Sequence, residues 1–158
     1  MAFVLGSKSK AELKGVHPLL IELVNRSIEI TEQDFSVHDG LRTEAEQQEY
    51  VRRGVSKTMN SKHRVQKDGF GHAVDLVPYI NGKLRWEWKP IFVIASAVHT
   101  AACEIGVPLI WGGVWDREFN ALEGKPADME RAVNSYVARR RAMGKTAFID
   151  GPHYELRL

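Results

Sequence analysis

Two histidines and two aspartates in three short segments have side chains of the types that a metal-dependent hydrolase uses. His63 precedes a glycine-containing turn, Asp75 lies in an apolar run, and Asp150 and His153 flank a Gly-Pro pair. Two imidazoles and one carboxylate are a ligand set of catalytic zinc, because three protein ligands leave a fourth tetrahedral position for water. The sequence therefore favours Zn²⁺-dependent hydrolysis.

The apolar run His72–Val77 is rich in β-branched residues and predicts a strand. Successive side chains of a strand point to opposite faces, so Asp75 and His72 should not bind the same metal ion. His63 can reach Asp75, because Asp68-Gly69 is a turn signal that lets the chain fold back. At the other segment, a tight turn lets Asp150 and His153 face a common point. From the residues alone, either one can be the ligand while the other holds the water.

These residues carry a resemblance to a known family. The three parts of the motif are Ser61-x-His63, Gly71-x-Ala73-x-Asp75 and Asp150-x-x-His153. Together they resemble the signature of the D-alanyl-D-alanine metallopeptidase family, which includes VanY-like carboxypeptidases, D-Ala-D-Ala dipeptidases and the L-alanyl-D-glutamate endopeptidases of bacteriophage endolysins. Further segments are similar to the endolysin branch, namely Leu5–Ile28, Phe35–Arg42 with Gln47, Pro78–Lys83 with Trp86-Glu87, and Trp111–Trp115.

The resemblance implies a role for each matching residue. Position by position, it implies zinc ligands at His63, Asp75 and His153, the catalytic base at Asp150, and a substrate-site arginine at Arg42. A solvated arginine is the alternative for Arg42, and Ser61 is expected to orient the substrate or the loop. One departure is that seven residues lie between His63 and Gly71 where the family usually has two. We therefore expect a loop that is longer by five residues, placed at the rim of the site.

The order of expected elements indicates an α+β fold. Expected helices cover residues 18–30, 43–54 (opened by a capping box at Thr43), 90–106 and 126–143. Strands are expected at 35–37, 72–77, 109–111 and 154–158, with a hairpin turn at Asn81-Gly82. We expect a small, mainly antiparallel sheet with the zinc site on one face and helices packed on the other. The resemblance implies the same hedgehog/D-Ala-D-Ala-peptidase-like fold. Residues 1–158 are expected to form a single peptidase domain, with an added helical segment at about 120–145 and no separate wall-binding module.

Composition limits the other classes of function. The 158 residues are 44% hydrophobic and 27% charged, with a formal net charge of +2, which is too small to predict a nucleic-acid binder. A single cysteine, Cys103, excludes an internal disulfide, and its helical neighbour His99 is expected to be structural. No secretory signal or transmembrane segment is expected. Together with the family resemblance, this implies a protein that is made in the host cytoplasm and acts on the cell wall after the membrane is permeabilised. We expect it to be a monomer.

Several alternatives stay open. The leading prediction is a peptidoglycan peptidase that cuts the L-Ala–D-Glu bond of stem peptides during lysis. A D,D-carboxypeptidase or dipeptidase acting on D-Ala-D-Ala is the enzymatic alternative, and a zinc-containing binding module is the non-enzymatic one. The basic run Arg139–Arg141 is typical of a solvated helix face, with contact to an anionic wall or membrane surface as the weaker alternative. Trp111 and Trp115 are expected either to line a groove or to belong to the core.

Overall fold

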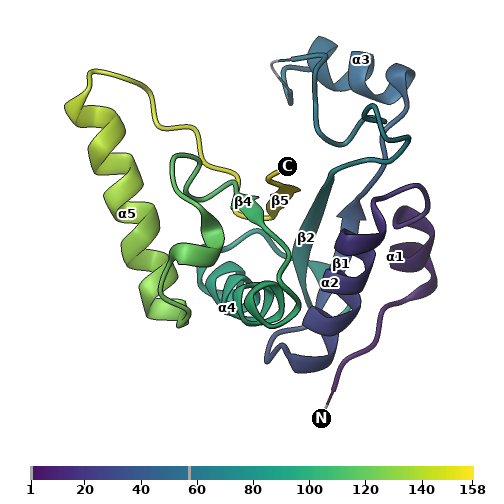
Figure 1. Ribbon diagram of the computed structural model, residues 1–158, viewed down its shortest axis with the longest axis horizontal. Coiled ribbons are helices and arrows are strands. Elements are labelled where there is room, and N and C mark those ends of the chain that lie inside the picture. Colours follow the sequence, from purple (N-terminus) through teal and green to yellow (C-terminus); the bar gives the residue numbers. More distant parts are fainter. Residues whose placement is uncertain (1, 57) are drawn as a thin grey trace.

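The structure is a computed structural model that describes residues 2–56 and 58–158. Its elements are α1 (Ser7–Glu12), α2 (Pro18–Ile30), β1 (Phe35–Asp39), α3 (Glu44–Arg52), β2 (Ala73–Ile80), β3 (Lys83–Leu84), α4 (Trp88–Ile105), β4 (Leu109–Trp111), the short 3-10 helix η1 (Phe119–Ala121), α5 (Pro126–Ala142) and β5 (His153–Leu156) (Figure 1). The expected α+β class is confirmed.

All strand pairs of the sheet are antiparallel. The hydrogen-bonded order is β1-β2-β5-β4, and the short β3 pairs with β2. The strand that comes last in the sequence therefore lies between β2 and β4. Its register places His153 directly opposite Asp75.

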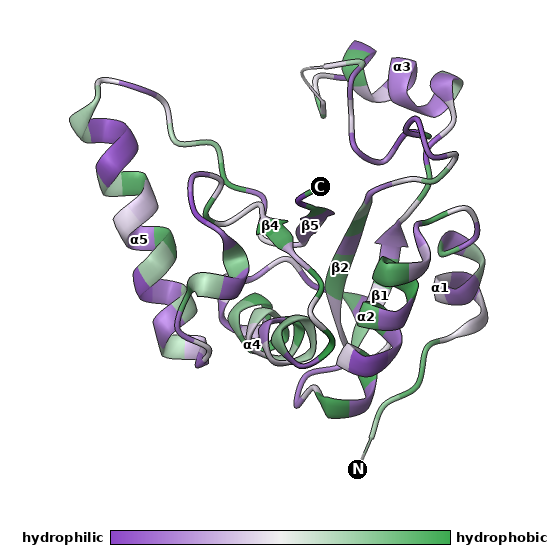
Figure 2. Ribbon diagram, in the orientation of Figure 1, coloured by the Kyte–Doolittle hydropathy of each residue, from purple (hydrophilic) through white to green (hydrophobic). Residues whose placement is uncertain are grey.

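The two faces of the sheet differ in character because side chains alternate along each strand. Val74, Leu76, Trp111 and Tyr154 belong to the hydrophobic core, which also includes residues of α2 and α4. Asp75 and His153 project from the opposite face. In Figure 2, β2 and β4 carry mainly hydrophobic colours, whereas hydrophilic and hydrophobic residues alternate along α5. The expected division of the sheet into a core face and a site face is confirmed.

Local signals account for most element boundaries. His17 caps α2 by accepting a hydrogen bond from the Leu19 amide, and Thr43 forms the expected capping box at the start of α3. Asn81 and Gly82 both have positive φ angles, as a tight hairpin requires.

Strand bounds differ from the expectation by a few residues. The β1 strand extends to Asp39, and β2 runs from Ala73 to Ile80. The last strand begins at His153, one residue earlier than expected.

The added helix α5 packs on α4 and buries Met129, Val133 and Tyr136. Part of its basic character is neutralised within the chain: Arg139 donates two hydrogen bonds to Asp116, at 2.8 and 2.7 Å. The described helices include none with the length and apolar composition that a bilayer crossing needs.

Candidate metal centre

Three side chains from separate parts of the chain meet on the open face of the sheet. Asp75 comes from β2, His153 from the neighbouring β5, and His63 from the long loop before β2. One ligand atom from each lies within 4.8 Å of the others. The side chains are only 2%, 13% and 10% exposed for His63, Asp75 and His153. The structure thus brings together the three predicted ligands, and this buried group could hold a metal ion.

The separations of the ligand atoms fit a tetrahedral ion. The Asp75 Oδ1 atom lies 3.2 Å from His63 Nε2 and 3.3 Å from His153 Nδ1. A tetrahedral ion with bonds of about 2.0–2.1 Å has ligand-to-ligand edges of about 3.3–3.4 Å. The two separations from Asp75 therefore fit a tetrahedral ion, and the two histidine nitrogens lie within 4.8 Å of each other.

His63 is held by backbone groups on both sides. Its Nδ1 atom donates to the Gly40 carbonyl oxygen at 2.8 Å, which leaves Nε2 for the metal. Its own carbonyl accepts from the Arg42 amide, also at 2.8 Å. The Ser61 hydroxyl accepts from the His63 amide at 3.1 Å. This hydrogen bond connects Ser61 to the loop that carries His63.

Mutual charge determines how the ligands ionise. Burial alone would raise the pKa of Asp75, but the charge of His63 and the hydrogen bonds from both histidines hold that pKa well below its usual range. Burial would lower the pKa of His153, yet its hydrogen bonds to Asp75 and Glu155 outweigh burial and raise the pKa to about 10. The carboxylate ligand is thus ionised at neutral pH.

Asp150 stands beside the ligand cluster and is not part of it. Its backbone amide donates to the Gly112 carbonyl at 2.8 Å, and a Cβ atom on Gly112 would lie 2.1 Å from the Asp150 carbonyl oxygen. The absent side chain of Gly112 therefore permits this close approach of the two backbone segments. Burial, and then the charge of Asp75, raise the pKa of Asp150. That carboxyl group is therefore a stronger base than an exposed aspartate.

Arg42 is fixed in place with one nitrogen directed to the site. Its Nε atom donates to Asp39 at 2.7 Å and its Nη1 atom to Gln47 at 3.1 Å, while the guanidinium lies over the Tyr50 ring at 4.4 Å. The remaining Nη2 atom lies 3.6 Å from Asp75 Oδ2. Arg42 is thus not a freely solvated arginine.

Aromatic residues divide between the core and the site. Trp111 is fully buried in the core, so its groove-lining alternative is wrong. Trp115 packs on the His153 ring with centroids 5.2 Å apart, and Phe148 stacks on Trp115 at 6.3 Å. Phe148 is 53% exposed and was not anticipated from the sequence. Its position just before the Asp150-x-x-His153 motif was the sequence signal that could have placed this aromatic residue near the site.

The other histidines lie outside the cluster. His72 contacts Asp68 at 2.7 Å, and His17 lies 3.7 Å from the same carboxylate oxygen, so this group ties the long loop to the start of α2. His99 and Cys103 are adjacent on α4, with Nε2 and Sγ 3.8 Å apart. Among the described residues, neither the group around Asp68 nor the His99–Cys103 pair forms a cluster that could hold a metal ion.

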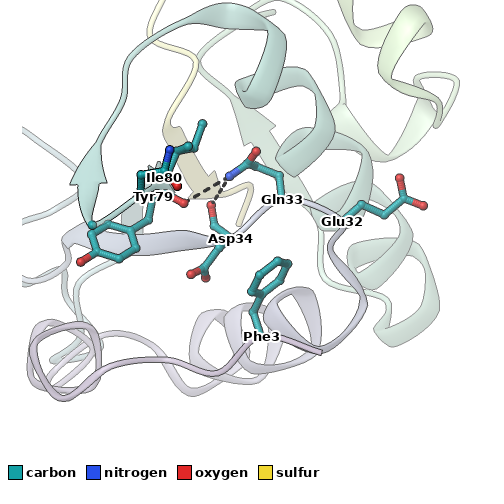
Figure 3. Close-up of a pocket in the computed structure, with 8 residues that line it drawn as sticks. Phe3, Glu32, Gln33, Asp34, Tyr79 and Ile80 are labelled. Atoms are coloured by element: carbon teal, nitrogen blue, oxygen red, sulfur yellow. Dashed lines mark hydrogen bonds between the residues drawn. The ribbon is translucent and has the colours of Figure 1, made fainter. Parts of the chain in front are cut away.

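A separate pocket opens at the other end of the β1–β2 pair. It is lined by Phe3, Glu32, Gln33, Asp34, Tyr79, Ile80, Asn81 and Gly82 (Figure 3). Gln33 Nε2 donates to the carbonyl oxygens of Asp34 and Tyr79 across it. Since Asp39 and Asp75 pair at the opposite end of these strands, the pocket is not part of the metal centre.

Comparison with known proteins places this geometry in a family. A family model described as phage L-alanyl-D-glutamate peptidase matches residues 1–131, a range that includes His63 and Asp75. The L-alanyl-D-glutamate peptidase of Escherichia phage T5 is 32% identical over 120 residues, which cover 73% of this chain and 84% of that relative.

Structural similarity extends through the distal motif. The crystal structure of the L-Ala D-Glu endopeptidase ChiX of Serratia marcescens matches with a TM-score of 0.69 and 32% identity. The match covers 98% of this chain and 90% of that one. With most of its length matched by the family model and its two-histidine, one-carboxylate cluster assembled on the sheet, the chain belongs to the phage L-alanyl-D-glutamate peptidase family.

Proposed function

We propose that the protein is a zinc-dependent endopeptidase that hydrolyses the L-Ala–D-Glu bond of peptidoglycan stem peptides. The observation that carries the proposal is the buried group of His63, Asp75 and His153, with Asp75 Oδ1 at tetrahedral spacing from both histidine nitrogens and Asp150 beside it. The bond is assigned from the relatives, whose names specify L-alanyl-D-glutamate peptidase activity.

Zinc is the metal that best suits this donor set. Two imidazoles and one carboxylate in a tetrahedral arrangement are typical of zinc hydrolases, whereas calcium and magnesium prefer sites of oxygen ligands. When bound, zinc would polarise the scissile carbonyl and lower the pKa of a water molecule.

Asp150 supplies the proton transfers in this proposal. Its carboxylate accepts a proton from the attacking water and passes it to the leaving amine of D-Glu. The pKa of Asp150 is raised towards neutral pH, which helps its carboxyl group both to accept and to return a proton. A neighbouring cation would favour the ionised form that accepts the proton first.

Arg42 faces the substrate in this proposal. Asp39 and Gln47 bind two of its nitrogens, so the direction of Nη2 is set before substrate arrives. A fixed guanidinium stabilises a developing oxyanion or binds a carboxylate of the stem peptide. Ser61 would add its hydroxyl at the substrate side of the loop, besides the bond that it already makes to His63.

The cellular role follows the phage family. We propose that the protein is made in the host cytoplasm and degrades the wall during lysis, once the membrane is permeabilised. It would act as a monomer, and the unpaired part of the basic run on α5 would contact the anionic wall or membrane surface weakly.

Mass spectrometry of a peptidoglycan digest tests the proposal. The zinc-loaded protein should release peptides that begin with D-Glu and leave L-Ala on the glycan, and a chelator should prevent both. Release of D-Ala in place of these fragments would support the D,D-peptidase alternative. Zinc binding without any cleavage would overturn the enzymatic role and support a binding module.

A further inference from the structure

We infer that Glu155 is a positioning residue that fixes the His153 ring for metal binding through Nδ1. The inference rests on the proposed zinc peptidase function and adds a residue to its machinery. Glu155 Oε1 accepts a hydrogen bond from His153 Nε2 at 2.8 Å. With Nε2 acting as the donor, Nδ1 directs its lone pair to the point that Asp75 and His63 also face.

The strand explains why Glu155 can reach that atom. Glu155 is two residues after His153 on β5, so both side chains emerge from the same face of the sheet. Its neighbours across the sheet are Ala73 on β2 and Ile110 on β4, neither of which carries a charge. The Glu155 side chain is 14% exposed, and its described hydrogen bonds and ion pairs go to His153. A carboxylate placed there has a specific partner, since burial of an unpaired charge is costly.

The two histidines are oriented in opposite senses. Gly40 holds Nδ1 of His63, so that ring presents Nε2, whereas Glu155 holds Nε2 of His153, so that ring presents Nδ1. One acceptor is a neutral backbone carbonyl and the other is a carboxylate. A carboxylate acceptor increases the basicity of the imidazole more strongly than a carbonyl does. Glu155 should therefore contribute affinity for the metal as well as orientation.

Zinc affinity, measured by competition with a chelator, tests this role. Glu155→Gln keeps the shape and removes the charge, and should weaken zinc binding by about 10–100-fold, the usual effect of losing such a partner. Glu118→Gln is the matched control, because it removes a carboxylate that pairs with Arg157 just after β5 and touches no ligand. The control should bind zinc like the wild type. Equal affinity in Glu155→Gln and the wild type would overturn the inference.

A spectroscopic measurement on the wild type avoids any folding defect of a variant. Long-range ¹H–¹⁵N spectra of the zinc-loaded protein should show His153 with a proton on Nε2 and none on Nδ1. The reverse pattern would overturn the role of Glu155 while leaving a zinc peptidase intact. Failure of the wild-type protein to bind zinc would overturn the proposed function together with this inference, so the two failures are distinguishable.

Discussion

At the residue scale, the charged neighbours of Asp150 act on its ionisation in opposite directions. Asp75 disfavours its ionisation, whereas His63, His153 and Arg42 favour it. Because Asp150 is outside the ligand cluster, Asp150→Asn should keep zinc and lose about 10²–10⁴-fold in the rate of wall hydrolysis. Zinc content and hydrolysis should be measured on the same preparation.

The matched comparison for this variant is Asp75→Asn, which should lose metal and activity together. Near-wild-type hydrolysis by fully loaded Asp150→Asn would remove Asp150 from the mechanism. Loss of zinc from it would make Asp150 a ligand.

His153 should make metal binding depend on pH. Its pKa of about 10 is above the ordinary value near 6.5. Protonated His153 therefore stabilises the metal-free fold fully below about pH 6.5, and this contribution is lost as pH rises through about 10. The nitrogen that binds the metal must be deprotonated, so zinc displaces this proton when it binds at a pH below about 10.

The contribution of this group to zinc affinity should accordingly rise by about tenfold per pH unit as the pH approaches 10 from below, and level off above it. Titration calorimetry at pH 8, in buffers with different ionisation enthalpies, should detect release of one proton from His153. Binding enthalpies that are independent of the buffer would contradict the raised pKa.

At the element scale, the turn after β4 lies against Asp150, the proposed base. A Cβ on Gly112 would lie 2.1 Å from the Asp150 carbonyl oxygen, so Gly112→Ala must push the Asp150 segment away. Displacement of a catalytic group by about 1 Å can cost on the order of 10²-fold in rate. We therefore expect Gly112→Ala to retain zinc and to lose on the order of 10²-fold in kcat.

Gly6→Ala is the control for this glycine substitution, because Gly6 has an ordinary φ of −74° and nothing within 4 Å of an added Cβ. Assays of kcat and zinc content should separate the two variants. Unchanged kcat in Gly112→Ala would show that this turn does not position Asp150.

The long loop before β2 should be dispensable for the metal. The Gln66 amide donates to the Phe70 carbonyl at 2.8 Å, so the loop closes on itself, and the His72 amide donates separately to Lys62 at 2.7 Å. Deletion of residues 65–69 keeps the second bond and should keep zinc, at the cost of the Asp68–His72 contact. Metal analysis checks this, and loss of zinc would show that the loop builds the site.

Elements with strong local signals were predictable from the sequence. The α2 helix, the α3 capping box and the Asn81-Gly82 hairpin depend on residues close together in the chain, and each was anticipated. The strand order was not predicted: β5 pairs with both β2 and β4 and lies between them. Local composition does not determine which strands pair.

The site was only partly predictable for the same reason. The gathering of His63, Asp75 and His153 followed from the motif, but the partners of these side chains did not. Gly40 is 23 residues from His63, and it contacts the ring through a carbonyl that every residue possesses. Glu155 was identifiable only once β5 was known to begin at His153, which places both side chains on one face.

At the scale of the whole molecule, the metal should stabilise the fold. The cluster links β2, β5 and the long loop, so a bound ion holds together parts that are far apart in sequence. A metal at 1,000 times its dissociation constant adds about 4 kcal/mol to the free energy of unfolding. Chelation should lower the Tm by several degrees in calorimetry.

The Asp75→Asn variant provides the control for the thermal measurement. Its Tm should respond little to zinc or chelator, because it lacks the carboxylate ligand. An equal Tm for loaded and chelated wild-type protein would contradict a structural contribution of the metal.

The position of β5 between β2 and β4 has a consequence for synthesis on the ribosome. Until β5 emerges from the exit tunnel, β2 and β4 have no strand to join them, and the nascent chain lacks His153. Such long-range pairing closes late, because the entropy of a large loop must be overcome first. Translation arrest after β4 should therefore yield chains without hydrolytic activity, so that the enzyme becomes active only once β5 has been synthesised and has joined the sheet.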